Sequence, residues 1–419
     1  MKTQRRSGKQ EVEEEAKPEA GTTKGVNRRT FIKVAAAGAV LLMGGGVWRM
    51  SSQGVFSAGK GPAYEPWDDW DSEGQDAERS IVRAAILASS PHNSQPWLFR
   101  IAPDQVDLFA DPSRNLGAMD PLLREMHIGL GCALENMSIT AAAHGLKAEI
   151  AYVPDPGNPA HIASVRLSPG TGLSRELHEY IPRRHTNRAA YDVGRQVGAD
   201  QLRALSESGD NAAHRTIWLQ SDEDKTRIGQ LIVDATEAIT QDPDQSRDSN
   251  RWFRHNWKQL QQSADGVTID ASGNSAFART LGKTLPNLSN EQSDAYWLTS
   301  TQLVQVPTAS AFGIILIPDH RDVAGLLHAG RLWQRMHLRA VRDGLAVQPL
   351  NQIHERADRE EALGSDARFG RALKELTAGY PASAPTPANA AVFTFRIGYE
   401  LEPALKSPRR PIGDVLLPT

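Results

Sequence analysis

Residues 89–97 form a short polar segment, SSPHNSQPW, that could present hydrogen-bonding groups to a ligand. An apolar stretch expected to be helical stops here, and Pro96 favours an extended exit because a proline ring fixes φ and restricts the preceding residue. Ser90, Asn93 and Gln95 carry polar side chains, and backbone amides in such a turn are not consumed by a strand ladder. The segment is interpreted as a binding loop, with a simple capped turn as the alternative.

Residues 183–188 (RRHTNR) could bind an anion. Arg184, Thr186 and Arg188 occupy every second position, so in an extended chain their side chains point the same way. Two guanidinium groups and a hydroxyl on one side suit a phosphate or a carbonyl edge, because arginine presents a planar fork of donors. The alternative interpretation is a solvated basic arm.

A second basic pair, Arg409 and Arg410, lies close to the C-terminus within residues 406–410 (KSPRR). It follows an expected strand at residues 395–399 (FRIGY). A basic tail by itself often has no function, so this pair gains significance only if the chain folds it against the other two segments.

The elements that position these segments alternate between helix and strand. They are indicated by the spacing of apolar residues and by stop signals such as Gly145. Helices are expected at residues 77–89, 124–144, 222–240 and 325–342, and strands at 97–101, 106–109, 146–153, 162–167, 216–220, 312–317 and 392–397. The first two strands flank the turn sequence Pro103-Asp104-Gln105 and predict a hairpin. The fold class predicted is α+β.

A weak internal repeat relates the two parts of the chain. Shifting the sequence by 199 positions superimposes the expected helices 124–144 and 325–342, with five identities in sixteen positions. The identical pairs are Gly131/Gly330, Met137/Met336, Ala141/Ala340, Gly145/Gly344 and Leu146/Leu345. A duplication would give two related halves, residues 76–175 and 177–419, packed as an internal pseudo-dimer. Helix periodicity alone could also produce such identities by chance.

Residues 244–305 have no counterpart in the first half and are treated as an insertion. The segment is polar and carries Trp252 and Trp257 together with several glycines. This composition predicts a helix followed by a mobile surface segment. It could form a lid or a substrate wall over a pocket, or it could be only a solvated excursion.

The N-terminal residues 1–60 are interpreted as a signal and linker. Residues 27–33 (NRRTFIK) precede an uncharged stretch, 34–48, that is short for a spanning helix. The pattern resembles a twin-arginine export signal, which implies the twin-arginine translocase as a partner and passage across the cytoplasmic membrane of a folded, often cofactor-loaded protein. A clean small-x-small cleavage site is missing, so an uncleaved anchor stays an open alternative. This anchor is the only membrane contact that the sequence predicts.

Composition excludes several other classes of protein. The formal net charge is −3 and the pI is about 6.5, which argues against nucleic acid and anionic membrane surfaces as partners. Cys132 is the single cysteine, which excludes an intramolecular disulfide and a cysteine metal cluster, and its apolar surroundings predict a buried thiol. Signatures of serine hydrolases, zinc proteases and nucleotide-binding P-loops are missing, so the sequence predicts no metal site, and it leaves the catalytic residues unknown.

Four segments together resemble the flavin site of nitroreductases. Residues 89–97 resemble the flavin-contacting loop of that family, and residues 183–188 resemble its N-terminal arm, with Thr186 in place of serine. Residues 395–399 with the following basic pair resemble its C-terminal strand, and residues 344–352 resemble its Gly-Leu segment beside the flavin ring. The branch that the chain resembles most is the Acg-type group, in which one polypeptide contains both halves of the site.

The resemblance implies a nitroreductase-like fold with central, mostly antiparallel sheets and flanking helices in both halves. It also implies an FMN site between the loop of half one and the arm of half two. The residues implied to contact FMN are Ser89, Ser90, Pro91, Asn93, Gln95, Arg184, Thr186, Arg188, Pro349, Leu350, Asn351, Arg409 and Arg410. By analogy, Arg184, Arg409 and Arg410 suit the phosphate, Arg188 suits the N1/C2 side of the ring, and the backbone at 349–351 suits the N5 edge.

The implied activity is transfer of hydride or electrons through flavin N5 to a small conjugated acceptor, either quinone-like or nitroaromatic. Export creates a tension, because NAD(P)H, the usual donor in this family, is cytoplasmic. A flavin-sequestering protein with little turnover is the alternative, and a non-flavin exported binding protein is a third possibility. Two departures leave the redox tuning open: Pro91-His92 replaces the family's usual serine, and the Asn/Lys pair beside the flavin's pyrimidine edge is not located.

Overall fold

The computed structural model describes residues 46–71, 76–172, 174–207, 213–380 and 389–418. The chain divides into two units, residues 1–47 and 48–419, and the second contains both large sheets. The twin-arginine motif at residues 27–33 lies outside the described residues. None of the helices within the described residues is both long enough and apolar enough to cross a membrane.

The first sheet is antiparallel and contains the predicted hairpin. Its strand order is β1-β2-β4-β3, formed by β1 (Trp97–Ala102), β2 (Gln105–Ala110), β3 (Leu146–Tyr152) and β4 (His161–Pro169). Strands β1 and β2 pair from Trp97 with Ala110 to Ala102 with Gln105, which leaves a two-residue turn with Asp104 at φ 55°. Aspartate tolerates this left-handed conformation, so the turn sequence accounts for the register.

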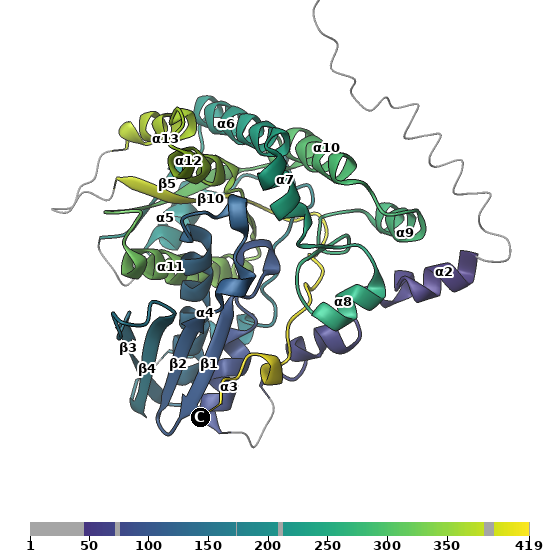
Figure 1. Cartoon of the computed structure of the whole chain (residues 1–419). Helices are drawn as coiled ribbons and strands as arrows, with labels where there is room; N and C mark the ends of the chain where they lie inside the picture. Colours follow the sequence, from purple (N-terminus) through teal and green to yellow (C-terminus); the bar gives the residue numbers. More distant parts are fainter. Residues whose placement is uncertain (1–45, 72–75, 173, 208–212, 381–388, 419) are drawn as a thin grey trace, which may run out of the picture. The chain divides into compact units, whose positions relative to one another are not determined.

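The second sheet is also antiparallel and is buried on both faces. Its order is β5-β8-β10-β9, formed by β5 (Arg215–Leu219), β8 (Ala311–Ile317), β9 (Ala346–Pro349) and β10 (Ala390–Gly398). Phe312 and Ile314 of β8 pack with α6 (Asp222–Gln241), α12 (Gln352–Leu363) and α13 (Arg368–Ala378), whereas Ile315 faces the main core. Figure 1 shows these three helices gathered on one side of the sheet. Because alternate side chains enter two cores, the strand is apolar without interruption.

The two halves share six elements in the same order, once the additional elements of half two between β5 and β8 and between β9 and β10 are set aside. Half one runs α3 (Ala77–Ala85), β1, β2, α4 (Arg124–Ala143), β3 and β4, and half two runs α5 (Ala199–Ser206), β5, β8, α11 (Val323–Arg342), β9 and β10. Each half therefore reads helix, strand, strand, helix, strand, strand, and each sheet has the order first, second, fourth, third. The predicted α+β class, with mostly antiparallel sheets and flanking helices, is confirmed.

The long helices α4 and α11 cross at equivalent glycines. A Cβ atom on Gly131 would lie 2.1 Å from Leu327 O, and one on Gly330 would lie 2.0 Å from Ile128 O. The shift of 199 positions that relates Gly131 to Gly330 also relates Ile128 to Leu327. Only glycine allows the two backbones to approach so closely, and the contact has the same form seen from either helix.

Polar contacts next to the crossing repeat this symmetry. Gln334 Nε2 donates to Asn136 Oδ1 at 2.9 Å, and Arg335 Nε donates to Glu135 Oε1 at 2.5 Å. Shifting Glu135 and Asn136 by 199 positions gives Gln334 and Arg335, so the two hydrogen bonds join equivalent pairs of positions. The helix pair thus behaves as an isologous interface within one chain.

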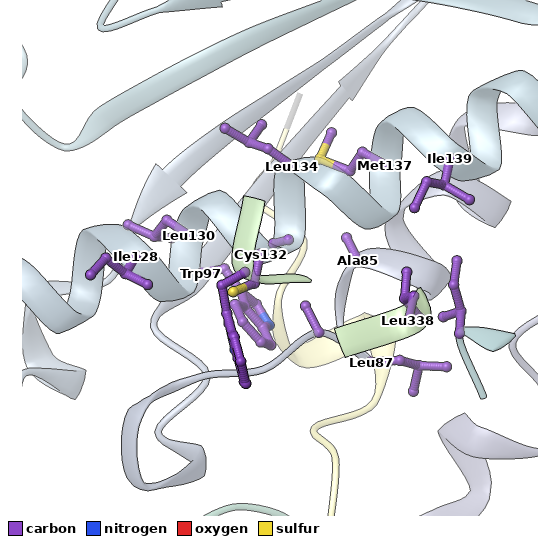
Figure 2. Packing of buried hydrophobic residues seen from close by; sticks show 14 of the residues in the cluster. Ala85, Leu87, Trp97, Ile128, Leu130, Cys132, Leu134, Met137, Ile139 and Leu338 are labelled. Atoms are coloured by element: carbon purple, nitrogen blue, oxygen red, sulfur yellow. The ribbon is translucent and has the colours of Figure 1, made fainter. Parts of the chain in front are cut away.

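Cys132 lies buried in the core beside this crossing, as the sequence predicted. Its Sγ donates to Gly330 O at 3.3 Å, and burial raises the pKa of the thiol. Figure 2 shows the thiol among apolar side chains that include Trp97 and Leu130. A buried, protonated thiol is a poor nucleophile, so packing explains this cysteine.

The insertion contains four helices rather than the single helix expected. Residues 244–305 hold most of α7 (Pro243–Asn250), β6 (Phe253–Arg254), α8 (Trp257–Ser263), β7 (Val267–Thr268), α9 (Ala276–Thr284), α10 (Asn290–Ser300) and the π-helical turn Thr301–Gln305. Asn256, Ser275 and Ser289 cap three of these helices by accepting a hydrogen bond from a first-turn amide. Part of the polar composition that suggested irregular chain therefore serves as helix caps.

The remaining described elements are short. They are α2 (Gly46–Ser52) and the 3-10 turns Val55–Ser57, Pro62–Trp67, Pro91–Asn93, Pro112–Arg114, Gly117–Met119, His178–Tyr180 and Ile412–Asp414. Among them, Pro62–Trp67 and Pro91–Asn93 bring residues to the candidate site described below.

Candidate cofactor-binding site

The loop between α3 and β1 has an unusual backbone. His92, Asn93 and Gln95 have φ values of 47°, 53° and 52°, although none of them is glycine. Each such residue costs roughly 1–3 kcal/mol and persists only where its surroundings hold it in place. Ser90 Oγ accepts a hydrogen bond from the Gln95 amide at 3.1 Å, which closes the loop on itself. Strain of this kind is concentrated at ligand-binding sites.

The insertion packs directly on this loop. Asn93 Nδ2 donates to Gly266 O at 3.2 Å, and the Gly266 amide donates back to Asn93 O at 3.1 Å. Gln95 Nε2 donates to Ala264 O at 2.9 Å. The polar side chains that the sequence assigned to a ligand are thus engaged in part by residues 264–266.

The C-terminal basic pair meets the loop from another side. Arg409 Nη1 donates to Asn93 Oδ1 at 2.6 Å, and Arg409 Nη2 donates to Ala88 O at 3.1 Å. The amide of Arg410 donates to Gln95 Oε1 at 2.9 Å. Loop and tail, more than 300 residues apart, therefore form one hydrogen-bonded unit.

The arm of half two also reaches the loop of half one. Arg184 Nη1 donates to Ser89 Oγ at 3.0 Å, and its Nη2 donates to Leu87 O at 3.0 Å. Four residues on, Arg188 Nη1 donates to Ala271 O of the insertion at 3.0 Å. Thr186, between the two arginines, is half-buried. The structure thus brings together the arm and the loop, as the sequence hypothesis required.

Residues 349–351 join the site through β9 and its neighbours. The Asn187 amide of the arm donates to Val347 O at 3.3 Å, which places the arm against β9. Pro349 ends β9, and Leu350 turns its side chain into the core between the second sheet and its covering helices. Asn351 Oδ1 accepts the Thr394 amide at 3.0 Å. The Leu350 side chain therefore packs in the core, and its amide donates to Thr394 O at 2.8 Å, so neither is free for a ligand.

The arginines of this site carry buried charge without acidic partners. Arg184 is 2% exposed and Arg409 is 3% exposed. Within the described residues, neither of them nor Arg188 forms an ion pair with a carboxylate, and Nε of both Arg184 and Arg409 is without a hydrogen-bond partner. Arginine is rarely buried this deeply unless it is paired. The arrangement therefore suits an anion.

The pKa values of these groups reflect the same imbalance. Burial, with a contribution from the charge of Arg188, lowers the pKa of Arg184 to about 10. Burial lowers the pKa of Arg188 to about 10 as well, and lowers that of Arg409 well below its usual value. Burial followed by repulsion from Arg184 lowers the pKa of His185 to about 3. A bound dianion would counter these shifts, because it adds the missing negative charge.

Trp67, which no sequence motif indicates, contacts two residues of this site. Its ring lies 4.6 Å from the Arg409 guanidinium carbon and 4.6 Å, edge-on, from the His185 ring. Trp67 Nε1 also donates to Ser407 O at 2.8 Å. The one sequence feature that could indicate this contact is the pair of tryptophans at positions 67 and 70, in a segment for which the sequence predicts no helix or strand. The carbonyl groups of Gly266 and Ala271, which accept hydrogen bonds from Asn93 and Arg188, could not be predicted either, because a backbone contact leaves no pattern of side chains in the sequence.

Comparison with known proteins found partial relatives. No family model matches the chain. A provisionally named NAD(P)H nitroreductase, Rv3131 of Mycobacterium tuberculosis, is 34% identical over 144 residues, which are 34% of this chain and 41% of that protein. A second provisionally named NAD(P)H nitroreductase of that organism, acg, is 39% identical over 94 residues, 22% of this chain and 28% of that protein. The chain thus spans less than half of the length of the curated relatives that it matches.

Solved structures give a looser likeness. A nitroreductase with bound FMN from Bacteroides fragilis superimposes with a TM-score of 0.32 and 16% sequence identity. The match covers 57% of this chain and 95% of that structure. At such a score the superposition carries no argument, so the contacts of the chain itself have to support any assignment.

Proposed function

We propose that this protein is an exported, FMN-binding oxidoreductase of the nitroreductase family. Its FMN phosphate would lie against Arg184, Arg409 and Arg410, with Arg188 near the N1/C2 side of the ring. Bound FMN supplies hydride or electron transfer at N5 to a small conjugated acceptor, quinone-like or nitroaromatic. The residues of the chain hold and orient the cofactor, and no side-chain nucleophile is needed.

The observation that carries the proposal is the buried, uncompensated positive charge. Arg184 donates to the backbone carbonyl of Leu87, and Arg409 donates to that of Ala88. Each keeps an unpartnered Nε. A phosphate offers several acceptor oxygens and negative charge, which is what such a pair of guanidinium groups lacks. A neutral ligand would leave the charge uncompensated.

The two-half architecture supports a shared site. Nitroreductase-like sites, as the resemblance describes them, draw the loop and the arm from different subunits. Here the loop belongs to half one and the arm to half two, and the two halves share one topology and an isologous helix crossing. We infer that the chain arose by duplication and replaces a homodimer with a pseudo-dimer.

Export is part of the proposal and has a separate basis. The paired arginines at positions 28 and 29, followed by an uncharged stretch, favour transport of the folded protein by the twin-arginine translocase. A cofactor that is enclosed between two halves is best loaded before transport, because the halves fold around it. Fractionation of cells that express the full chain tests this part: an Arg28→Lys, Arg29→Lys variant is expected to stay in the cytoplasm.

A second candidate function, flavin sequestration, is favoured by the insertion. Gly273 packs so closely on the arm that a Cβ atom there would lie 2.3 Å from the carbonyl carbon of Arg188. Residues 264–266 lie equally close to the loop through their hydrogen bonds to Asn93 and Gln95. An insertion that contacts both sides of the site could act as a lid and keep a reductant away from the flavin.

Flavin binding is tested with an adjacent pair of arginines. Arg184→Ala removes a charge-assisted contact worth roughly 1.5–3 kcal/mol, so the Kd for FMN should rise by about 10- to 150-fold. Riboflavin lacks the phosphate, and its Kd should be nearly unchanged. Arg183 is the matched control, because its side chain is 60% exposed, pairs with Glu179 and lies over the Tyr180 ring at the surface. If Arg184→Ala weakens FMN and riboflavin equally, the phosphate assignment is wrong.

Turnover is tested with the flavin-loaded protein in a stopped-flow instrument. Bleaching of the flavin band by NADPH or by a quinol, followed by reoxidation with a quinone or a nitroaromatic compound, would establish the oxidoreductase. Bleaching by neither donor, with tight FMN binding retained, would favour sequestration. Protein that shows no flavin band after reconstitution would contradict both functions.

A further inference from the structure

A buried acidic cluster lies beside the loop, where α4 and α12 begin. Its four carboxylates belong to Asp120, Glu125, Glu355 and Asp358, which are at most 5% exposed. Arg124 is the cation within the cluster: its Nε lies 2.7 Å from Asp358 Oδ2, and its Nη2 lies 3.5 Å from Glu125 Oε1. One guanidinium group cannot balance four carboxylates. Burial of the excess negative charge therefore requires protons or a cation.

Two oxygen atoms of the cluster are without hydrogen-bond partners. Within the described residues, Glu125 Oε1 and Glu355 Oε2 are buried and accept no hydrogen bond, although each residue is only 5% exposed. Asp120, in contrast, uses both of its oxygens to accept the amides of Glu125 and Met126 at 3.0 and 2.9 Å. The amides of the first helical turn thus occupy both oxygens of Asp120, whereas each glutamate keeps one oxygen without a hydrogen bond, and Glu125 Oε1 has only Arg124 Nη2 at 3.5 Å as an ion-pair partner.

His92 of the strained loop completes a triangle with these glutamates. One ring nitrogen of His92 and one carboxylate oxygen each of Glu125 and Glu355 all lie within 4.8 Å of one another. His92 has a left-handed backbone conformation, at φ 47°. Ser249 Oγ lies 3.2 Å from His92 Nε2 and can orient the ring, as partners of metal-binding histidines commonly do.

We propose that His92, Glu125 and Glu355 bind a divalent transition-metal ion of the zinc or manganese type. One imidazole and two carboxylates are a ligand set that such ions accept, and two positive charges offset the two unsatisfied glutamates. Contraction to metal–ligand bonds of about 2.0–2.2 Å needs side-chain movements of less than about 1 Å. The site goes beyond the proposed flavin function and does not depend on it, although His92 and Asn93 are adjacent.

The ion would join segments that are far apart in the sequence. His92 comes from the loop, Glu125 from the start of α4 in half one, and Glu355 from the first turn of α12 in half two. Binding therefore couples the loop conformation to the seam between the halves. Metal that binds the folded chain and not the unfolded chain adds stability, so the melting temperature should rise with zinc concentration.

The test uses the full chain, treated with a chelator and dialysed. Titration calorimetry with ZnCl2 or MnCl2 is expected to show about one ion per chain, with affinity at least about tenfold weaker in Glu355→Gln and in Glu125→Gln. Glu223→Gln, at an exposed position in the first turn of α6, is the matched control and should bind as the wild type does. Equal binding by wild type and both site variants would mean adventitious surface ions and would overturn the proposal.

Cobalt provides a readout that does not rely on variants. Co2+ added to wild-type protein should give visible absorption bands of a nitrogen- and oxygen-ligated site, and one equivalent of Zn2+ should remove them. A featureless spectrum with no zinc uptake would overturn the metal site. The buried negative charge would then be reduced by a proton that the two glutamates share. Flavin absorbance measured on the same samples keeps this outcome separate from failure of the FMN assignment.

Discussion

Gly330→Ala tests whether the two halves meet as the structure shows. Ordinary contacts of a Cβ atom begin near 3.4 Å, whereas the added methyl group would lie 2.0 Å from Ile128 O. The two backbones would have to separate by about 1.4 Å at the crossing to restore that distance. Neither obstacle can turn away, because the methyl group and the carbonyl are both fixed to helical backbone.

The expected magnitude follows from two opposing effects. Gly→Ala within a helix normally stabilises by about 0.8–1.0 kcal/mol, because alanine has the higher helix propensity. Overpacking in a close-packed interior costs typically about 1–3 kcal/mol, and more where backbone has to move. For Gly330→Ala the second effect dominates, so we expect the free energy of unfolding to fall by about 2 kcal/mol. Gly131→Ala should lower the free energy of unfolding by a similar amount, because its Cβ atom would meet Leu327 O at 2.1 Å.

Urea unfolding followed by circular dichroism measures these changes, and Gly370→Ala provides the matched control. Gly370 lies inside α13, where an added Cβ atom meets only Ala367 Cβ at 3.9 Å, so this variant should be more stable than the wild type. The double variant at Gly131 and Gly330 should lose less than the sum of the single losses, since one separation of the helices relieves both clashes. A gain in stability for Gly330→Ala would refute the crossing.

Two further predictions concern buried charge. The pKa of His185 is lowered to about 3 by burial first and by Arg184 next, so the unfolded chain binds an extra proton between about pH 6.5 and 3. Flavin-free protein should therefore lose stability as the pH falls through this window, by up to about 1.4 kcal/mol per pH unit more than His185→Phe. Glu135, 0% exposed, pairs with Arg331 Nε and Arg335 Nε at 3.0 and 2.5 Å. Glu135→Gln should lower the free energy of unfolding by about 3–5 kcal/mol, as measured by urea titration, whereas Glu149→Gln, at an exposed position, should leave it nearly unchanged.

Local chemistry made much of the fold predictable. The turn at 103–104, the end of α4 before Gly145 and the apolar run of β8 each depend on neighbours in the sequence, and all were placed correctly. The insertion was harder to predict. Its helices are short, and α10 has no clear apolar stripe, so apolar periodicity is a weak guide to them, whereas their serine and asparagine caps are visible in the sequence.

The residues of the site could be predicted only where the resemblance to a known family indicated which distant segments lie together. Nothing local to Arg184 indicates that it contacts Ser89, 95 residues away, or that both lie near the tail. Trp67, whose contacts with Arg409 and His185 span long stretches of sequence, gave no motif at all. The expectation of no metal site rested on missing local signatures, and Glu125 and Glu355 form none because 230 residues separate them. Contacts between residues that are far apart in the sequence become visible only in the folded structure.

Two halves that share one topology are compatible with a single proposed site, because the residues at the two helix starts differ. Under the 199-residue shift, Arg124 and Glu125 at the beginning of α4 correspond to Val323 and Ala324 at the beginning of α11. The crossing glycines are kept on both helices, whereas the charged pair exists on α4 alone. Packing symmetry therefore does not require chemical symmetry. A chain containing both halves can keep one helix start for a polar site and use the other for the hydrophobic core, which a homodimer of identical subunits cannot do.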